Sequence, residues 1–422
     1  MSRGLEAARA TPSPSPPPSA APLSPPAASA EGGGPWRVER VERLGAEADL
    51  ERLRGEWNEL LAASRADTLF LTPEWLLTWW RHLGGGLEPA LLAVRRGGRL
   101  AALAPLAVGR GRSRPWPPAL RFLGTGEVGS DYLDVVVRAG AEPEALAALA
   151  DHLDRERRPV ELAQLPRVGS AAALLAGMLE RRGWRALERV TGVCPWIDLA
   201  GRSWDDYLAE LGSSHRANFR RRLRKLERRF AVHFERADSP QELEEAFEAF
   251  LRLHRARWAG RGGSDALDGS AVAGFHRELT RRALDRGWLR LYLLRLDDRP
   301  AAALYGFLYR GRFLFYQSGF DPAFAEHGVG LVTMGLAIRE AIAEGAREYD
   351  LLHGDEPYKF LWAGRRRELV RLELYPPTVA GGLRLAGRLA GRRPLRAARS
   401  AARRALSTRL GSRLAPLFGR GG

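Results

Sequence analysis

In the first half of the chain, stretches in which apolar residues recur at the helical spacing alternate with stretches that have the pattern of β-strands. Residues 36–64 begin with a strand-like stretch and continue at helical spacing, and a second helical segment covers 71–83. In that segment Thr72 suits the N-cap and Pro73 the first helical position. The apolar runs PALLAV and LAALAPLAV flank RRGGR, which predicts a β-hairpin. Strands around a glycine-rich bend (LRFLGTGEVGSDYLDVVV), then helix, strand, helix and strand, extend to Asp198.

The second half repeats this order of elements. Helical patterns at about 241–258 and 270–286 precede three strand-like runs, LRLYLLRL, AAALYGFLY and RFLFYQSGF. A loop, the helical stretch VGLVTMGLAIREAIAEG and the strand EYDLL complete it. Two similar α+β units roughly 200 residues apart predict an internal duplication. The alternative is two unrelated α/β segments.

Composition divides the chain further. Residues 1–35 are rich in Ala, Pro and Ser and lack an apolar core, which predicts a disordered tail. Two folded regions are expected at 36–200 and 201–378, followed by a basic tail at 379–422. The formal net charge is +16, but residues 381–422 hold eleven arginines and no acid, so the remainder carries +5. The tail is amphipathic, and we expect either disorder or peripheral contact with an anionic membrane surface.

Several classes of protein find no support in the sequence. No run of roughly 18 apolar residues suggests a membrane span, and the single cysteine, Cys194, forms no intrachain disulfide and fits a cytoplasmic protein. Cys194 lies in the apolar stretch GVCPWIDL, which favours a packing role over a nucleophile. Neither HExxH, paired cysteines, GxSxG nor a Walker motif occurs, so no metal site, serine hydrolase or P-loop is expected.

A glycine turn in the second half is the first candidate site. His327, Gly328, Val329 and Gly330 lie between the strand ending at Gly319 and the next helix. Glycines at a strand-to-helix turn allow backbone amides to face an anion such as a pyrophosphate. Most Gly-x-Gly turns are plain helix starts, and the full dinucleotide-binding fingerprint is absent.

A basic helix is the second candidate. Residues 213–230 place apolar side chains on one stripe and cations on the other faces. Arg216, Asn218 and Arg220 near its start are candidates to contact an anionic substrate or cofactor. A solvated helix explains the same charges, and the segment lacks interleaved aromatics for stacking on bases, so no specific nucleic acid is expected.

The third candidate is GDEPYKFLWA, residues 354–363, which follows the strand EYDLL. A phenol can act as a general acid and a carboxylate as a general base. The candidates are Tyr358, Lys359 and either Asp350 or Asp355, with Phe360 and Trp362 as apolar anchors. The alternative is a capped turn whose aromatic residues belong to the core.

In this order, the segments resemble the GNAT superfamily, and more narrowly its FemAB-like, CelD-type acetyltransferase group, which is often associated with polysaccharide biosynthesis. The terminal element of that group is similar to Gly354, Asp355, Tyr358, Lys359 and Trp362 here. The resemblance spans roughly residues 36–375 and is strongest from 200. It implies an α+β fold of two tandem GNAT-like domains with mostly antiparallel sheets, the first domain degenerate. It also implies acetyl-CoA or another acyl-CoA as donor and no metal.

The resemblance also implies roles for residues. The pyrophosphate would rest on the amides of Gly328, Val329, Gly330 and Leu331, although Ala325 stands where the family carries Gln or Arg. The thioester would enter beside Gln317, Ser318 and Gly319, with Tyr316 next to the substrate, and Tyr358 would protonate the leaving thiolate.

The acceptor would be an amine or hydroxyl of a sugar, a polysaccharide precursor or a related small molecule. FemAB relatives use aminoacyl-tRNA, so a tRNA-dependent aminoacyltransferase is one alternative. A non-catalytic component of a polysaccharide-biosynthesis cluster is the other.

Overall fold

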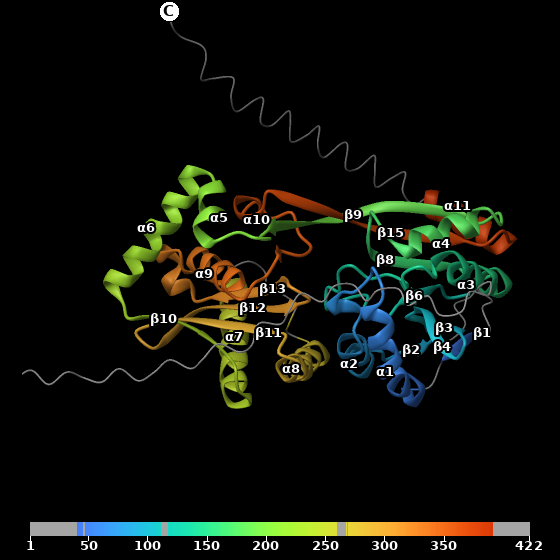
Figure 1. Ribbon diagram of the computed structural model, residues 1–422, viewed down its shortest axis with the longest axis horizontal. Helices are drawn as coiled ribbons and strands as arrows, with labels where there is room; N and C mark the ends of the chain where they lie inside the picture. The colour runs from blue at the N-terminus through green and yellow to red at the C-terminus, as the bar shows by residue number, and fades with distance from the viewer. Residues whose placement is uncertain (1–39, 45–46, 111–116, 260–266, 268, 391–422) are drawn as a thin grey trace, which may run out of the picture. The chain divides into compact units, whose positions relative to one another are not determined.

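The computed structural model describes residues 40–44, 47–110, 117–259, 267 and 269–390 (Figure 1). The predicted N-terminal tail at 1–35 and residues 391–422 of the predicted basic tail lie outside the described residues. Within the described part of the chain, no helix is both long and apolar enough to cross a membrane.

The first half has the element order expected from its periodicity. Thr72 caps its second helix by accepting a hydrogen bond from the Trp75 amide at 3.2 Å, and Pro73 occupies the first helical turn. The predicted hairpin is formed by β3 and β4. The elements are β1 (Arg40–Leu44), α1 (Glu47–Ala62), η1 (Leu69–Leu71), α2 (Pro73–Leu83), β2 (Leu87–Pro89), β3 (Leu91–Arg96), β4 (Arg99–Ala104), β5 (Leu106–Gly109), β6 (Leu120–Phe122), β7 (Val136–Val137), α3 (Glu142–Glu156), β8 (Val160–Pro166), α4 (Ala171–Glu180) and β9 (Arg185–Asp198).

The second half repeats the order of strands and helices after two additional helices at its start. Its long helix α9 begins at Val329, directly after Gly328. The elements are α5 (Trp204–Glu210), α6 (Ser213–Arg229), β10 (Val232–Arg236), α7 (Pro240–Ala259), α8 (Ser270–Asp285), β11 (Leu289–Leu296), β12 (Arg299–Tyr309), β13 (Arg312–Phe320), η2 (Pro322–His327), α9 (Val329–Ala343), β14 (Glu348–Asp350), α10 (Lys359–Trp362), β15 (Arg365–Tyr375) and α11 (Val379–Ala390).

The two halves share a sheet. Among the described strands, one sheet has the order β1-β3-β4-β7, and the larger has the order β10-β11-β12-β13-β14-β9-β15-β8-β6-β5-β2. The last strand of the first half, β9, pairs with β14 and β15, whereas β15 pairs with β9 and β8. Each half therefore places its last strand beside the other half, and Figure 1 shows β9 and β15 running side by side between the two groups of helices.

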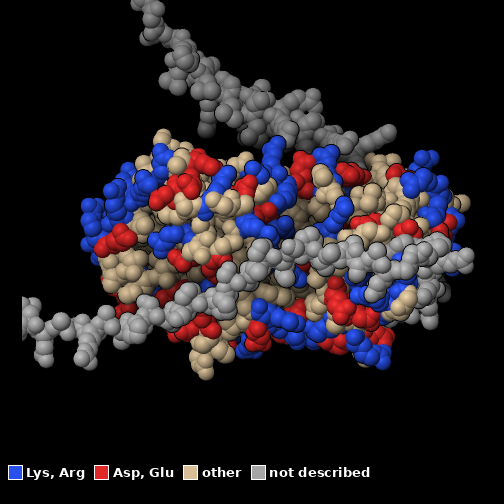
Figure 2. Space-filling view, in the orientation of Figure 1, with Lys and Arg blue, Asp and Glu red and all other residues tan. Residues whose placement is uncertain are grey.

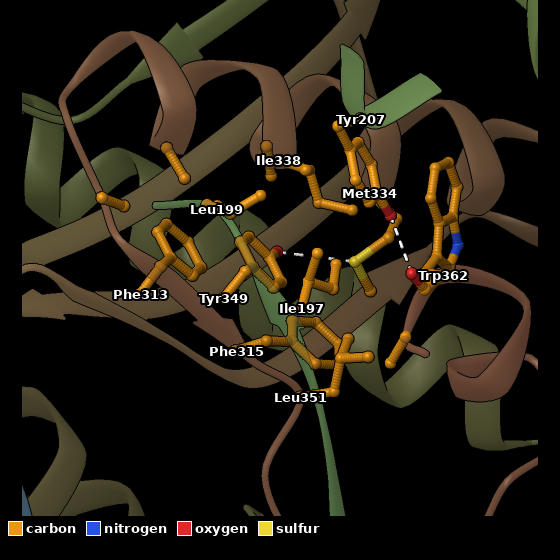
Figure 3. Close-up of a cluster of buried hydrophobic side chains, with 14 of the residues drawn as sticks. Ile197, Leu199, Tyr207, Phe313, Phe315, Met334, Ile338, Tyr349, Leu351 and Trp362 are labelled. Carbon is orange, nitrogen blue, oxygen red and sulfur yellow. Dashed lines mark hydrogen bonds between the residues drawn. The ribbon is translucent and has the colours of Figure 1, made fainter. Parts of the chain in front are cut away.

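A buried apolar cluster holds the segment that carries the third sequence candidate. Phe313 of β13 stacks on Tyr349 of β14 at a ring distance of 4.4 Å, and the Tyr349 hydroxyl contacts the Met334 sulfur at 3.5 Å (Figure 3). Trp362 of α10 is buried in this cluster, and its carbonyl accepts a hydrogen bond from the Tyr207 hydroxyl at 2.9 Å. Trp362 thus fixes the end of the 354–363 segment.

Phe360 was also predicted to be an anchor, and that prediction is wrong, because its side chain is 41% exposed. The helix α10 has a single turn, so it cannot bury both aromatic side chains on one face. The partners of Trp362 come from α6, where His215 meets its ring edge-on at 4.5 Å and Phe219 at 5.8 Å.

The predicted basic tail begins as an ordered helix. Arg388 of α11 donates to both carboxylate oxygens of Glu373 on β15, and Arg384 donates to Glu161 on β8. Gly381 lies so close to the Pro376 carbonyl that a Cβ there would sit 2.2 Å from its oxygen. Residues 379–390 are therefore packed on the folded body.

Candidate active site

The site is organised by the separation of two parallel strands. β13 and β14 pair only from Arg312 to Leu314 and from Glu348 to Asp350, although β13 continues to Phe320. A bulge in the pairing of β13 with β12 inserts Tyr316 as an extra residue directly after the paired stretch. Bulges bend a strand, so β13 leaves β14 and exposes a strand edge. No described strand pairs with this edge beyond Leu314.

The three strand residues predicted to flank a thioester lie on this edge. Gly319 is required by close packing, because a Cβ there would lie 2.4 Å from the His254 amide nitrogen of α7. Arg257, also on α7, donates to the Ser318 hydroxyl at 2.8 Å and to its carbonyl at 3.2 Å. Gln317, the residue before Ser318, is half-buried.

The glycine turn forms the N-terminus of α9. Gly328 adopts a left-handed conformation with φ of 72°, and its amide donates to the Ala325 carbonyl at 3.0 Å. The next three amides, of Val329, Gly330 and Leu331, are in the first helical turn, where an α-helix offers no acceptor. A helix N-terminus with free amides favours an anion. His327 is buried behind the turn, with its Nδ1 atom lacking a hydrogen-bond partner.

A cation reaches this turn from α6. Arg222 donates to the Glu326 carbonyl, and its side chain lies over Gly328, 3.2 Å from where a Cβ would be. Position 325 carries Ala where the resembled family has Gln or Arg, and Arg222 brings a cation to the turn from another element. Arg222 follows the buried Phe219 by three residues, so the two side chains are neighbours on α6. This spacing is the feature of the sequence that could have indicated that Arg222 borders the packed face of the helix.

The α6 residues named from the sequence lie elsewhere. Arg216 donates to the carbonyls of Leu208 and Ala209 at the end of α5, at 3.2 and 2.8 Å. Asn218 accepts a hydrogen bond from Arg221 at 2.9 Å, and Arg220 is exposed. The structure does not bring these three side chains to the glycine turn.

Tyr358 and Lys359 lie next to each other but in different environments. Tyr358 is half-buried against the cluster of Figure 3, and burial raises the pKa of its hydroxyl to about 12, with Glu356 adding to the rise and a hydrogen bond with Arg257 opposing it. Lys359 is buried and donates to the His353 carbonyl at 2.8 Å, while pairing with Glu356 at 3.1 Å. Lys359 thus holds the loop of residues 353–356 in place. Arg257 interacts with both the Tyr358 hydroxyl and Ser318.

The two predicted carboxylate bases differ in accessibility. Asp355 is exposed on the loop before Tyr358. Asp350 is fully buried, and it accepts hydrogen bonds from the Tyr132 hydroxyl at 2.7 Å, the Leu352 amide at 2.8 Å and Arg367 at 3.2 Å. Burial raises the pKa of Asp350, while these three donors oppose the rise. With three donors on its two oxygens, Asp350 is a structural link between the halves.

A carboxylate that the sequence did not single out lies at the point where β13 and β14 separate. Asp131, in the glycine-rich bend of the first half, is buried and accepts hydrogen bonds from the His353 amide at 2.8 Å and from Gln164 at 3.0 Å. Burial raises its pKa to about 7, the Asp350 charge contributes to the rise, and Lys359 and the two hydrogen bonds oppose it. The sequence SDY in a glycine-rich bend was the feature that could have pointed to Asp131. Its hydrogen-bond partner His353, however, is 222 residues away in the chain.

Tyr316 and Cys194 border the same carboxylate. The Tyr316 hydroxyl donates to the Val128 carbonyl, and burial followed by the Asp131 charge raises its pKa. Cys194 is buried on β9, and burial followed by the same charge raises the pKa of its thiol. A thiol that stays protonated is a poor nucleophile, which agrees with a packing role. In the described residues no group of three or more His, Cys, Asp or Glu side chains is arranged to hold a metal ion.

Residues 213–360, which run from α6 to α10, match the family model described as Acetyltransferase (GNAT) domain. The protein is therefore an enzyme with a GNAT acetyltransferase domain in its second half. No curated protein matches the chain in sequence.

Solved structures resemble the chain over most of its length. The crystal structure of FemX aligns with a TM-score of 0.56 at 12% identity, over 76% of this chain and 95% of FemX. L-PGS from Bacillus licheniformis aligns at 0.48 and 14% identity, over 83% and 99% of the two chains. A tandem GNAT protein from the clavulanic acid biosynthesis pathway aligns at 0.43 and 13% identity, over 80% and 100%. The likeness to FemX is one of fold, and it agrees with the predicted α+β architecture of two GNAT-like halves.

Proposed function

We propose that the protein transfers an acetyl or longer acyl group from acyl-CoA directly to an amine or hydroxyl. The observation that carries this proposal is the glycine turn of α9, which presents three free amides beside the open edge of β13. The amides of Val329, Gly330 and Leu331 would hold the pyrophosphate, with Arg222 adding a charge beside them. Backbone groups of β13 around Gln317 and Ser318 would position the thioester and polarise its carbonyl.

Tyr358 would stabilise the leaving thiolate. Its pKa of about 12 keeps the phenol protonated at neutral pH, so the hydroxyl is available as a donor. A thiolate has a pKa of about 8.5, so complete proton transfer from Tyr358 would be uphill. Hydrogen-bond donation to the departing sulfur is the role that this difference favours.

The acceptor is proposed to be a sugar or a polysaccharide precursor. This part rests on the resemblance of the ordered motifs, ending in Gly354, Asp355, Tyr358, Lys359 and Trp362, to the CelD-type group.

The donor site is tested by Gly330→Asp. Gly330 is exposed in the first turn of α9, where an acidic side chain favours the helix but repels a pyrophosphate. We expect wild-type protein to bind acetyl-CoA in isothermal titration calorimetry. The affinity of Gly330→Asp should fall at least about 100-fold, because a new charge opposes the ligand and a free amide is covered.

Matched variants separate this effect from damage to the fold. Gly330→Ala should bind as wild type, since a Cβ at this position makes an ordinary contact of 3.6 Å with Phe320. Arg222→Ala should weaken binding about 10-fold, the size of one charge-assisted hydrogen bond, whereas Arg220→Ala on the exposed face should not. Unchanged affinity in Gly330→Asp would contradict a pyrophosphate at this turn.

A second candidate donor, aminoacyl-tRNA, is favoured by the charge of α6. The helix carries eight arginines and lysines and a single acid, Glu227, and Figure 2 shows Lys and Arg gathered over the position of α6. Such a helix suits a phosphate backbone, and binding through it would weaken steeply with salt. Salt-dependent tRNA binding in a filter assay, together with no heat from acetyl-CoA, would favour this donor. Binding of neither would contradict both proposed donors.

A further inference from the structure

Strained backbone gathers around one buried carboxylate. Seven non-glycine residues among those described have positive φ, and four of them lie in turns or at a helix end. The other three are Tyr132, Gln164 and Leu352, with φ of 55°, 60° and 54°. Tyr132 follows Asp131, Gln164 donates to it, and Leu352 precedes its donor His353. Left-handed non-glycine residues persist where the surrounding structure holds them, and they cluster at functional sites.

Asp131 reaches this position on an insertion. In the first half, β5 pairs with β6 and β4 with β7, as β12 pairs with successive parts of β13 in the second half. β6 also pairs in parallel with β8, as β13 does with β14. Residues 123–135 therefore interrupt the strand that corresponds to β13. This loop extends to the second half, where Asp131 meets His353 and Tyr132 meets Asp350.

The first half has lost its own counterpart of the donor site. Its helix α3 corresponds to α9 by its place between β7 and β8, but its first turn carries Glu142 and Glu144. The Glu142 carboxylate accepts the Gly140 amide at 2.7 Å, so an acid occupies the place of an anionic ligand. Like charges there oppose a pyrophosphate.

Asp131 interacts with residues on both sides of the opening between β13 and β14. Pairing of β13 and β14 stops at Leu314 and Asp350, and the chain then reaches Tyr316 on one side and His353 on the other. Asp131 accepts the His353 amide, and its charge acts on Tyr316. Asp131 therefore lies beside both chain segments just beyond the point where the pairing of β13 and β14 ends.

The Asp131 carboxylate also accepts fewer hydrogen bonds than the Asp350 carboxylate. Each of its oxygens has one neutral donor, whereas Asp350 has three donors, one of them Arg367. The charged and titratable groups facing Asp131 are Asp350 of β14, Lys359 of α10, Cys194 of β9 and Tyr316 of β13. Free lone pairs on a carboxylate without a bonded cation suit a proton acceptor.

We propose that Asp131 of the first half is the catalytic base of the acyl-transfer site formed by the second half, an inference that rests on the function proposed above. A hydroxyl acceptor passes its proton to the Asp131 carboxylate as it attacks the thioester carbonyl carbon. An alkylammonium acceptor passes its extra proton to Asp131 before the neutral nitrogen attacks, and its second proton goes to the departing thiolate. The new C–N or C–O bond forms, the C–S bond breaks, and the sulfur leaves with its electron pair toward the Tyr358 hydroxyl. The site is complete only with both halves of the chain.

The test compares Asp131→Asn with wild type on two amine probes. Thiol release from acetyl-CoA is measured with butylamine, an alkylamine whose pKa is close to the 10.4 or so of lysine, and with hydroxylamine, which is unprotonated at neutral pH. We expect Asp131→Asn to bind acetyl-CoA as wild type in calorimetry. Its butylamine-dependent rate should fall about 100-fold and its hydroxylamine-dependent rate less than about tenfold, because only the ammonium must lose a proton before attack.

Asp134→Asn is the control in the same loop. Asp134 is buried and accepts the amides of Ala171 and Ala172 at the start of α4, at 2.9 and 2.8 Å, so its loss should lower stability but leave both rates per folded molecule unchanged. Equal losses with both amines in Asp131→Asn, or none, would overturn the proposal. So would a wild type that binds acetyl-CoA but releases no thiol with either amine. Failure of wild type to bind acetyl-CoA would instead refute the proposed function itself.

Discussion

Tyr358→Phe is expected to lower kcat about 100-fold, while the affinity for acetyl-CoA changes little. The hydroxyl interacts with Arg257, which also donates to Ser318 on the open edge of β13, and burial keeps the hydroxyl protonated. Losing one donor to a developing anion in a water-poor site typically lowers the rate by a factor of 10² to 10³. Because Phe keeps the ring that packs on the apolar cluster, the fold should be retained. Thiol release at saturating acetyl-CoA measures the effect.

Tyr375→Phe is the matched control for this variant. Burial also raises the pKa of Tyr375 to about 12, and its hydroxyl donates to Glu373 at 2.9 Å. It lies at the end of β15, ten residues beyond Arg365, which is roughly 33 Å along an extended strand. Its turnover should equal that of wild type. Turnover of Tyr358→Phe at the wild-type rate would remove the Tyr358 hydroxyl from the reaction.

Local pattern predicted the elements but not how the halves are joined. The helix at Thr72 and Pro73, the hairpin of β3 and β4 and the repeated order of elements all depend on residues near in sequence. The placement of β9 between β14 and β15 depends on pairings such as Tyr349 with Ile197. Alternating hydrophobicity indicates a strand but does not name its partner, so this arrangement could not be inferred.

In the candidate site too, the sequence identified features that depend on local residues and missed those that depend on distant contacts. The turn at Gly328 could be found because left-handed backbone demands particular residues. Asp350 and Tyr349 alternate along β14 and so project from opposite faces of the strand, yet both are buried, because the first half covers the second face. Asp131 and Arg222 were missed, since each joins the site through contacts with residues distant in sequence.

The stability of the protein is expected to fall as pH rises from about 4 to about 7, and Asp131→Asn should remove a large part of that fall. The pKa of Asp131 is about 7 in the folded protein and near 3.8 in an unfolded chain, mainly because burial disfavours the carboxylate. Between these values the folded state binds more protons than the unfolded state. The free energy of unfolding therefore decreases with rising pH, and the loss is complete above about pH 7.

Each pKa unit corresponds to about 1.4 kcal/mol, so the effect at Asp131 is on the order of a few kcal/mol. Urea unfolding of wild type and Asp131→Asn at pH 5 and pH 8 measures it. Asn should be accommodated, because the Gln164 amide can turn to present its oxygen to the new NH₂ group. The exposed Asp355→Asn should show the same pH 5 to pH 8 difference as wild type.

If Asp131→Asn shows the wild-type difference, Asp131 ionises in the fold without penalty and is held as an ordinary structural carboxylate. The variant could instead become more stable than wild type at pH 8 while losing transfer to butylamine. Asp131 would then lower the stability of the fold and at the same time support turnover. Such a trade-off is expected where a site keeps a group in an unfavourable environment for its reactivity. The left-handed backbone at Tyr132, Gln164 and Leu352 belongs to the same environment, and it would then be part of what keeps Asp131 reactive near neutral pH.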